Sequence, residues 1–293
     1  MLAMVILQSS RALASLSRIR EILDTEVDLN DEHCKEPDKI VSSGRVEFRD
    51  VSFRYYKENK EAVLSHISFA VKSGQTLGII GSTGSGKTTL VQMIPRLYDV
   101  DEGEVLVDGV NVKDYTLENL REGVSMVLQK NVLFSGTIKD NLRWGNPDAD
   151  DAEMERICRL AQADEFIRSF PDGYDTHIEQ GGSNVSGGQK QRLSIARAVA
   201  QKPEIMIFDD SFSALDFLTE SRLRACLAER LKGKTQIIVT QRVTTAMNCD
   251  KIYVFDGGRI DACGTHEELM RSCGIYREIY LSQTRRSAPE TGR

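Results

Sequence analysis

A glycine-rich string, GSTGSGKTT at residues 81–89, carries the clearest chemical signal in the chain. Gly81 is followed by four residues and then by Gly86, Lys87 and Thr88, which is the spacing of a phosphate-binding P-loop. Backbone N–H groups of such a loop surround anionic oxygens, the lysine adds positive charge, and the hydroxyl can hold Mg²⁺. A flexible Gly/Ser turn is the alternative, but a short apolar strand precedes the string and a helical pattern follows it. We predict that a nucleotide's phosphates contact Gly81, Ser82, Thr83, Gly84, Ser85, Gly86, Lys87, Thr88 and Thr89.

Four apolar residues that end in an acid, IMIFD at residues 205–209, predict a partner strand for the P-loop. Ligands gather at the carboxyl ends of parallel strands in α/β sheets, so Asp209 should lie beside the loop. A carboxylate in that place would orient the water shell of a Mg²⁺ ion that accompanies ATP. We therefore predict that Thr88 and Asp209 take part in metal binding.

The composition excludes several other functions. The net charge of −6 gives no basic field for nucleic acid, and the 6% aromatic content gives no stacking platform for single strands. The six cysteines contain no CxxC pair, which argues against a zinc site or a disulfide framework and indicates a reducing compartment. A length of 293 residues is ample for one large domain or two small ones.

Strand and helix patterns alternate along most of the chain and predict an α/β fold. The expected architecture is a P-loop NTPase core, a mainly parallel sheet with flanking helices, joined by an N-terminal antiparallel β subdomain and an inserted helical subdomain at about residues 137–200. A slip in the alternation at Asp50–Val51 predicts a β-bulge, and Asp108–Gly109 predicts a hairpin turn. Strands are expected at residues 46–56, 64–71, 77–80, 124–128, 205–208, 236–240 and 252–255, and helices at 137–170, 186–200 and 220–231 and from 266 onward.

The N-terminal 23 residues repeat apolar side chains at helical spacing, which predicts a helix with one apolar stripe. The run MLAMVIL is too short to span a bilayer, and no signal-peptide cleavage pattern follows it. From spacing alone, this helix could equally pack on its own domain or serve another one. Residues 24–44 are polar, acidic and without periodicity, so they are expected to form a linker.

A second glycine-rich string, VSGGQ at residues 185–189, resembles the signature of ATP-binding cassette (ABC) proteins, usually written LSGGQ. The alternative is an ordinary helix start with two glycines. In the ABC family the signature contacts the γ-phosphate of ATP held by the partner's P-loop, in a head-to-tail dimer. The resemblance implies that role for Ser186, Gly187, Gly188 and Gln189, with ATP and Mg²⁺ as cofactors.

The resemblance extends over residues 45–283 and implies further site residues. Tyr55 matches the aromatic that stacks on adenine, with Tyr56 as a possible substitute and an edge-strand tyrosine as the alternative reading. Gln129 matches the Q-loop glutamine, which reaches Mg²⁺ and faces the membrane domains. Asp216, in SALD, matches the D-loop that crosses the dimer interface.

Three segments resemble exporters within this family: THIEQGG at 176–182, FSGTIKDNL at 134–142 and SSRALASLSRIREILDTE at 9–26. The resemblance implies that residues 1–23 are the end of a transmembrane domain, that 45–283 form the nucleotide-binding domain and that 284–293 form a disordered tail. It also implies membrane domains as partners and a place at the cytoplasmic face of the cell membrane, with this chain itself soluble.

Two residues depart from the family pattern. Asp210 stands where active members carry the glutamate that polarises the attacking water, and Gln241, in QIIVTQRVTT, replaces the switch histidine. The shorter carboxylate is expected to place water poorly, unless a second water or a small backbone shift compensates, and a neutral amide cannot become a cation. Together with Gln129, these residues are the predicted catalytic group.

The two departures resemble the degenerate half of a heterodimeric ABC exporter. We therefore expect an ATPase of low intrinsic activity that couples ATP binding and hydrolysis to export. The alternatives are an ATP-gated regulatory module and a soluble, non-transport ABC ATPase.

Overall fold

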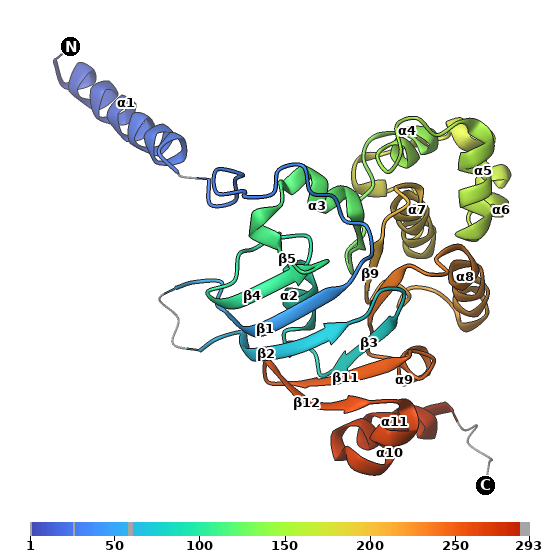
Figure 1. The fold of residues 1–293 in the computed structure, drawn as a ribbon. Helices are drawn as coiled ribbons and strands as arrows, with labels where there is room; N and C mark the ends of the chain where they lie inside the picture. The colour runs from blue at the N-terminus through green and yellow to red at the C-terminus, as the bar shows by residue number, and fades with distance from the viewer. Residues whose placement is uncertain (1, 26, 58–60, 288–293) are drawn as a thin grey trace, which may run out of the picture.

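The computed structural model describes residues 2–25, 27–57 and 61–287, which form two main sheets, a two-stranded ribbon, a helical subdomain and a projecting N-terminal helix (Figure 1). The larger sheet has the strand order β12-β11-β3-β10-β9-β6, and every neighbouring pair except β11–β12 is parallel. This arrangement confirms the predicted mainly parallel core. Its strands are β3 (Thr76–Gly81), β6 (Val124–Val127), β9 (Ile205–Asp209), β10 (Thr235–Val239), β11 (Lys251–Asp256) and β12 (Arg259–Gly264).

The antiparallel subdomain is a sheet of order β2-β1-β4-β5. It contains β1 (Val46–Phe53), β2 (Leu64–Val71), β4 (Glu102–Val107) and β5 (Val110–Asn111). The predicted bulge is present: the β1–β2 register shifts between Phe48 and Val51, and Asp50 has a positive φ of 50°. Asp108 and Gly109 both have positive φ, 51° and 82°, as a two-residue hairpin turn requires.

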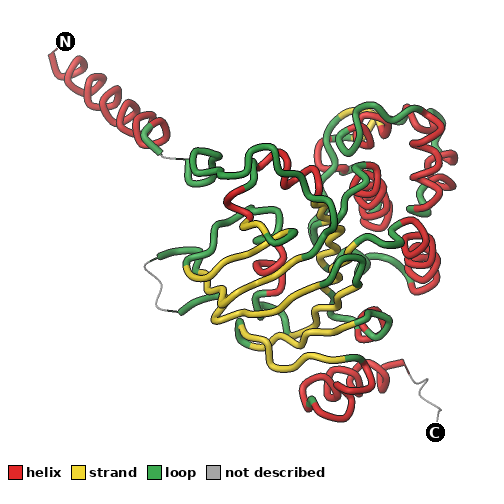
Figure 2. Tube along the Cα trace, viewed as in Figure 1, coloured by secondary structure: helices red, strands yellow, loops and turns green. Residues whose placement is uncertain are grey.

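The predicted helical subdomain is confirmed in position but is divided into shorter helices (Figure 2). It comprises α4 (Ile138–Arg143), α5 (Asp151–Leu160), α6 (Asp164–Ser169) and α7 (Gly187–Ala200). A short ribbon, β7 (Gly136–Thr137) with β8 (His177–Ile178), and the 3₁₀ turns η2 (Gly173–Asp175) and η3 (Gln180–Gly182) connect them. Polar N-caps such as Asp150 start new helices inside the stretch expected as one helical block.

The remaining helices flank the two sheets. They are α2 (Lys87–Gln92), the 3₁₀ turn η1 (Val112–Asp114), α3 (Leu117–Gly123), α8 (Phe217–Arg230), α9 (Val243–Ala246), α10 (His266–Ser272) and α11 (Gly274–Ser287). Because α11 continues to Ser287, the disordered tail expected from residue 284 is wrong for residues 284–287. Residues 288–293 of that expected tail lie outside the described residues.

The N-terminal helix α1 (Leu2–Leu23) has no buried residue and projects from the domain (Figures 1 and 2). Among the described residues, no helix combines the length and apolar character needed to cross a membrane. The following linker lies against the domain: the Cys34 Sγ donates to the Asp114 carbonyl at 3.0 Å, and Val41 is buried beside Gly123. A Cβ at Gly123 would collide with Val41, so this contact needs glycine.

Candidate nucleotide-binding site

The P-loop runs from the end of β3 into α2, as its spacing predicts. Gly84 and Gly86 have φ of 80° and 93°, and a Cβ at Gly81 would collide with the Phe255 carbonyl oxygen. Lys87 is 7% exposed, and its Nζ donates to the carbonyl oxygens of Gly81 at 3.0 Å and Ser82 at 2.6 Å. Burial lowers the pKa of Lys87, while the nearby carboxylates oppose that shift. The loop therefore holds the partly desolvated ammonium group of Lys87 at the N-terminus of α2.

Asp209 ends β9 directly beside the start of α2. The Thr88 Oγ1 donates to Asp209 Oδ1 at 3.0 Å, so two of the three residues predicted to bind metal are in contact. Asp209 is 1% exposed, and its Oδ2 is buried without a hydrogen-bond partner. Burial raises the pKa of Asp209, and the Thr88 hydrogen bond partly offsets this. A buried carboxylate oxygen that accepts no hydrogen bond has lone pairs available to coordinate a cation.

Asp210 brings the two predicted glutamines together. The Nε2 atoms of Gln129 and Gln241 both lie 3.4 Å from Asp210 Oδ2. Asp210 itself has a φ of 47°, and its N–H donates to the Val239 carbonyl at 2.9 Å. Burial raises the pKa of Asp210, and the charge of Arg242 lowers it by a smaller amount. The segments that follow β6, β9 and β10 therefore bring two side-chain amides into contact with one carboxylate oxygen.

Tyr55 closes the other end of the site. Its hydroxyl lies 2.9 Å from Thr89 Oγ1, and its ring makes edge contacts with Phe53 and Tyr98. Tyr55 is 44% exposed and lines the site, whereas Tyr56 is 71% exposed and does not. The geometry therefore favours Tyr55 over its possible substitute.

A single cavity of about 290 Å³ joins these groups. The sequence did not single out Val63, Val239 and Thr240, which also line it. The rule that ligands gather at strand carboxyl ends would have found Val239 and Thr240, because they end and follow β10. The predicted residues on its wall are Tyr55, Thr83, Gly84, Gly86, Lys87, Thr88, Thr89, Gln129, Asp209, Asp210 and Gln241.

The second glycine-rich string lies outside this cavity. Ser186 caps α7, because Gln189 N donates to its Oγ at 3.3 Å and Ser186 N donates to Gln189 Oε1 at 2.8 Å. Gly187 is exposed, with open space where a Cβ would lie. The string thus forms an open helix N-terminus that does not contribute to the chain's own cavity.

The predicted D-loop follows β9 and contacts the helix behind the signature. Ala214 N donates to the side chain of Gln191 in α7 at 3.1 Å. Asp216 caps α8 by accepting from Thr219 N at 2.9 Å. Asp216 therefore has a local structural role as the N-cap of α8.

The family model described as "ABC transporter" matches residues 64–213, which include both glycine-rich strings up to the D-loop serine. The chain belongs to the ABC transporter family. Its nucleotide-binding domain is of a kind whose members are ATPases, and the predicted α/β fold class is confirmed.

Two curated ABC relatives match nearly the whole chain. "Uncharacterized ABC transporter ATP-binding protein YfiB" of Bacillus subtilis is 45% identical over 99% of this chain and 50% of its own length. A "putative multidrug export ATP-binding/permease protein" of Staphylococcus aureus is 40% identical over 90% of this chain and 45% of its own length. The chain therefore spans about half the length of the curated ABC relatives that it matches.

About half of a solved ABC exporter chain has the same fold as this chain. The structure of a bacterial Atm1-family ABC exporter with ATP bound superposes with a TM-score of 0.87 at 32% identity. The match covers 97% of this chain and 48% of that one. The shared region includes α1 and the linker as well as the ABC domain, because almost the whole chain is covered.

Proposed function

We propose that this chain is the ATP-binding portion of an ABC exporter, which uses ATP binding and hydrolysis to drive export across a membrane. The observation that carries the proposal is the single cavity on which Lys87, Thr88, Asp209 and Asp210 converge. A P-loop cation, a hydroxyl and two strand-end carboxylates form the set that phosphoryl-transfer sites use. The multidrug-export name of one relative and the exporter title of the solved structure support the transport role.

Different site residues contact different parts of the ATP molecule in this proposal. Tyr55 presents an exposed ring for the adenine, and the amides and Lys87 at the start of α2 receive the phosphates. Thr88 and the unpartnered Asp209 Oδ2 fit Mg²⁺, a cation that prefers oxygen ligands, with Gln129 at the cavity mouth as a further oxygen donor. When bound, Mg²⁺ offsets charge on the phosphate oxygens.

We propose that this chain cleaves its own ATP slowly. We assign the orientation of water to Asp210, but both amides compete for one of its oxygens and its side chain is one methylene shorter than glutamate. A misplacement of about 1 Å in a water-positioning group costs on the order of a hundredfold in rate. Gln241 can donate a hydrogen bond to a phosphate but cannot carry a proton near neutral pH.

The signature string supports a second chain as partner. Ser186 and Gly187 are exposed and Gly188 is half-buried at a helix N-terminus outside the chain's own cavity, which suits a γ-phosphate bound elsewhere. We therefore propose a head-to-tail dimer, with this chain as the weak-site half of a heterodimer and its signature completing the partner's site.

Membrane domains are the other proposed partners. A groove of about 350 Å³ beside the Gln129 segment carries the exposed apolar side chains Leu128, Val132, Phe134 and Trp144. The apolar side chains of α1 are also unburied, as expected for the end of a membrane-domain helix. Both features suit contact with the membrane domains and a location at the cytoplasmic face of the cell membrane.

Replacing Asp209 with asparagine should stabilise the nucleotide-free chain by about 1 kcal/mol at neutral pH. The amide keeps an oxygen for the Thr88 hydroxyl and removes a buried charge. Because folding raises the pKa of Asp209, its ionised form is destabilising above that pKa, and the penalty disappears as the pH falls through it. The gain should therefore shrink in mild acid, as measured by urea unfolding at both pH values.

The same Asp209→Asn variant should lose most of the stabilisation that Mg-ATP gives the wild type. Asp172→Asn, a change of the same chemistry at an exposed position, is the control and should alter neither quantity. A variant that is less stable at neutral pH, or that Mg-ATP stabilises as strongly as the wild type, would contradict the role given to Asp209.

Action of the signature in trans can be tested with two copies of the chain joined by a flexible linker, which keeps their effective concentration high. One copy carries Asp210→Glu, Gln241→His and Gly188→Asp, and the other carries Lys87→Met. Only the first copy's P-loop with the second copy's signature can form a complete site. We expect ATP hydrolysis at least about tenfold above a fusion that carries Gly188→Asp in both copies. Equal rates for the two fusions would show that the signature does not act on the other copy's ATP.

A further inference from the structure

The loop after β10 determines where the Gln241 amide lies. It leaves the sheet at Val239 and enters the short helix α9, and its Gln241 Nε2 lies 3.4 Å from Asp210 Oδ2. Arg242 occupies the N-cap position of α9, but its side chain makes no capping hydrogen bond to the helix. The first N–H groups of α9 therefore need partners from elsewhere in the chain.

Gln283 of α11 supplies that partner. Its Oε1 accepts from Val243 N at 2.9 Å, and its Nε2 donates to the Gln241 carbonyl at 2.6 Å. A primary amide carries a donor and an acceptor side by side, so one side chain can hold both backbone groups. Gln283 thereby caps α9 and fixes the backbone of Gln241 from about 40 residues further along the chain.

The helix that carries Gln283 is itself anchored. Tyr276 in α11 is fully buried, and its hydroxyl lies 2.8 Å from His266 Nδ1. Ile279 and Tyr280 pack against the core beneath the sheet. Gln283 is therefore presented to the loop from a fixed helix.

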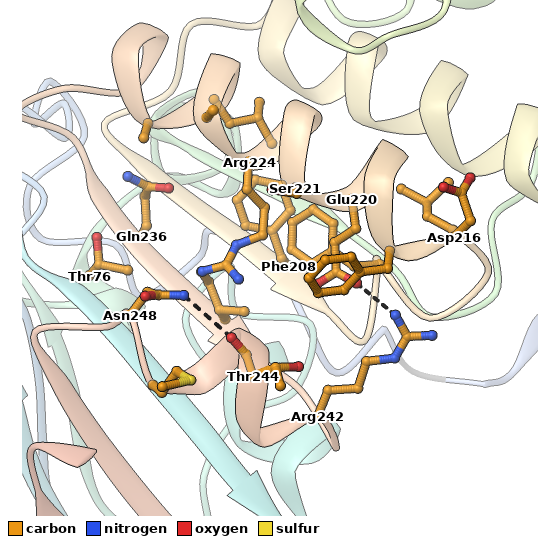
Figure 3. Close-up of a pocket in the computed structure, with 18 residues that line it drawn as sticks. Thr76, Phe208, Asp216, Glu220, Ser221, Arg224, Gln236, Arg242, Thr244 and Asn248 are labelled. Atoms are coloured by element: carbon orange, nitrogen blue, oxygen red, sulfur yellow. Dashed lines mark hydrogen bonds and ion pairs between the residues drawn. The ribbon is translucent and has the colours of Figure 1, made fainter. Parts of the chain in front are cut away.

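The loop is held on its other side by α8. Arg242 Nη1 lies 2.6 Å from Glu220 Oε2, the ion pair drawn in Figure 3, and Arg242 Nη2 donates to the Ser213 carbonyl at 3.1 Å. Between the loop and α11 lies a cavity of about 440 Å³, whose wall includes Asp210, Gln241 and Gln283. Val243 belongs to the same apolar cluster as Tyr276, so packing as well as the two Gln283 hydrogen bonds holds the α11 side of the loop.

We propose that Gln283 is a positioning residue for the nucleotide site, which holds the Gln241 amide where it contacts the terminal phosphate. The C-terminal helix then contributes to the discrimination between nucleoside triphosphate and diphosphate. This inference rests on the proposed function, because it takes the cavity beside Gln241 as the ATP site.

The test compares the affinities of the 293-residue chain for AMP-PNP and ADP, with Mg²⁺, by calorimetry. Gln283→Ala should lower the AMP-PNP-to-ADP affinity ratio about three- to tenfold, the size of one ordinary net hydrogen bond. Gln241→Ala should give the same loss, and the double variant no more, because both remove one interaction. Gln283→Glu keeps the acceptor for Val243 N but cannot donate when ionised, so it should behave like Gln283→Ala.

Glu278→Ala, at an exposed position on the same helix, is the matched control and should leave the ratio unchanged. A purely structural role would lower the melting temperature and weaken both nucleotides equally, and that result would overturn the inference. An unchanged ratio in Gln283→Ala or in Gln241→Ala would also overturn it while leaving the proposed function intact. Failure of the wild type to bind either nucleotide would overturn both.

Discussion

Replacing Lys87 with methionine should weaken Mg-ATP binding at least about a hundredfold, since charge-assisted hydrogen bonds to phosphate contribute roughly 1.5–3 kcal/mol each. Lys87 is buried at the N-terminal end of α2, and its ammonium points at the loop carbonyls of Gly81 and Ser82. Methionine keeps much of the side-chain volume but removes the charge that the phosphates need. Calorimetric titration of the variant with Mg-ATP measures the loss.

Lys72→Met is the control, because Lys72 is an exposed lysine in the turn before β3 and does not line the cavity. Its affinity for Mg-ATP should equal that of the wild type. Tight binding by Lys87→Met would mean that ATP occupies another part of the molecule.

Restoring both departures from the family pattern, with Asp210→Glu and Gln241→His, should raise the steady-state ATPase rate by about a hundredfold. The longer carboxylate reaches further into the cavity, and a histidine can carry the positive charge that the amide cannot. The rate is measured by phosphate release at saturating Mg-ATP.

The single variants separate the two contributions. Asp210→Glu alone should recover part of the rate, and Gln241→His alone less, because the water is still poorly placed. The same double change combined with Lys87→Met should have no activity. A double variant no faster than the wild type would show that these two positions do not limit hydrolysis.

The local parts of the site could be predicted from sequence because short-range geometry determines them. The P-loop needs glycines at fixed spacing, and its strand, turn and helix follow each other directly. The rule for strand carboxyl ends predicts that Asp209 lies beside Thr88, and the two side chains are in contact at 3.0 Å. The Asp108–Gly109 hairpin is likewise a property of two adjacent residues.

The parts that could not be predicted depend on contacts distant in sequence. The strand β12 is an edge strand that follows a two-glycine turn. Its side chains alternate between exposed and half-buried, so its sequence has no clear apolar–polar pattern that predicts a strand. The hydrogen bonds of Gln283 to the Gln241 loop join residues on different elements, and nothing in the spacing shows them. Similarly, the orphaned oxygen of Asp209 appears only once the packing around β9 is known.

The central claim is that this chain binds ATP at its P-loop and cleaves it slowly. The rate at which bound ATP becomes ADP tests this claim most directly. The wild-type chain is loaded with a substoichiometric amount of labelled Mg-ATP, and the nucleotide is recovered over time and separated into ATP and ADP. The account predicts that the wild type retains mostly ATP over a period in which the Asp210→Glu/Gln241→His variant converts its label to ADP. Conversion by the wild type at the rate of that variant would contradict it.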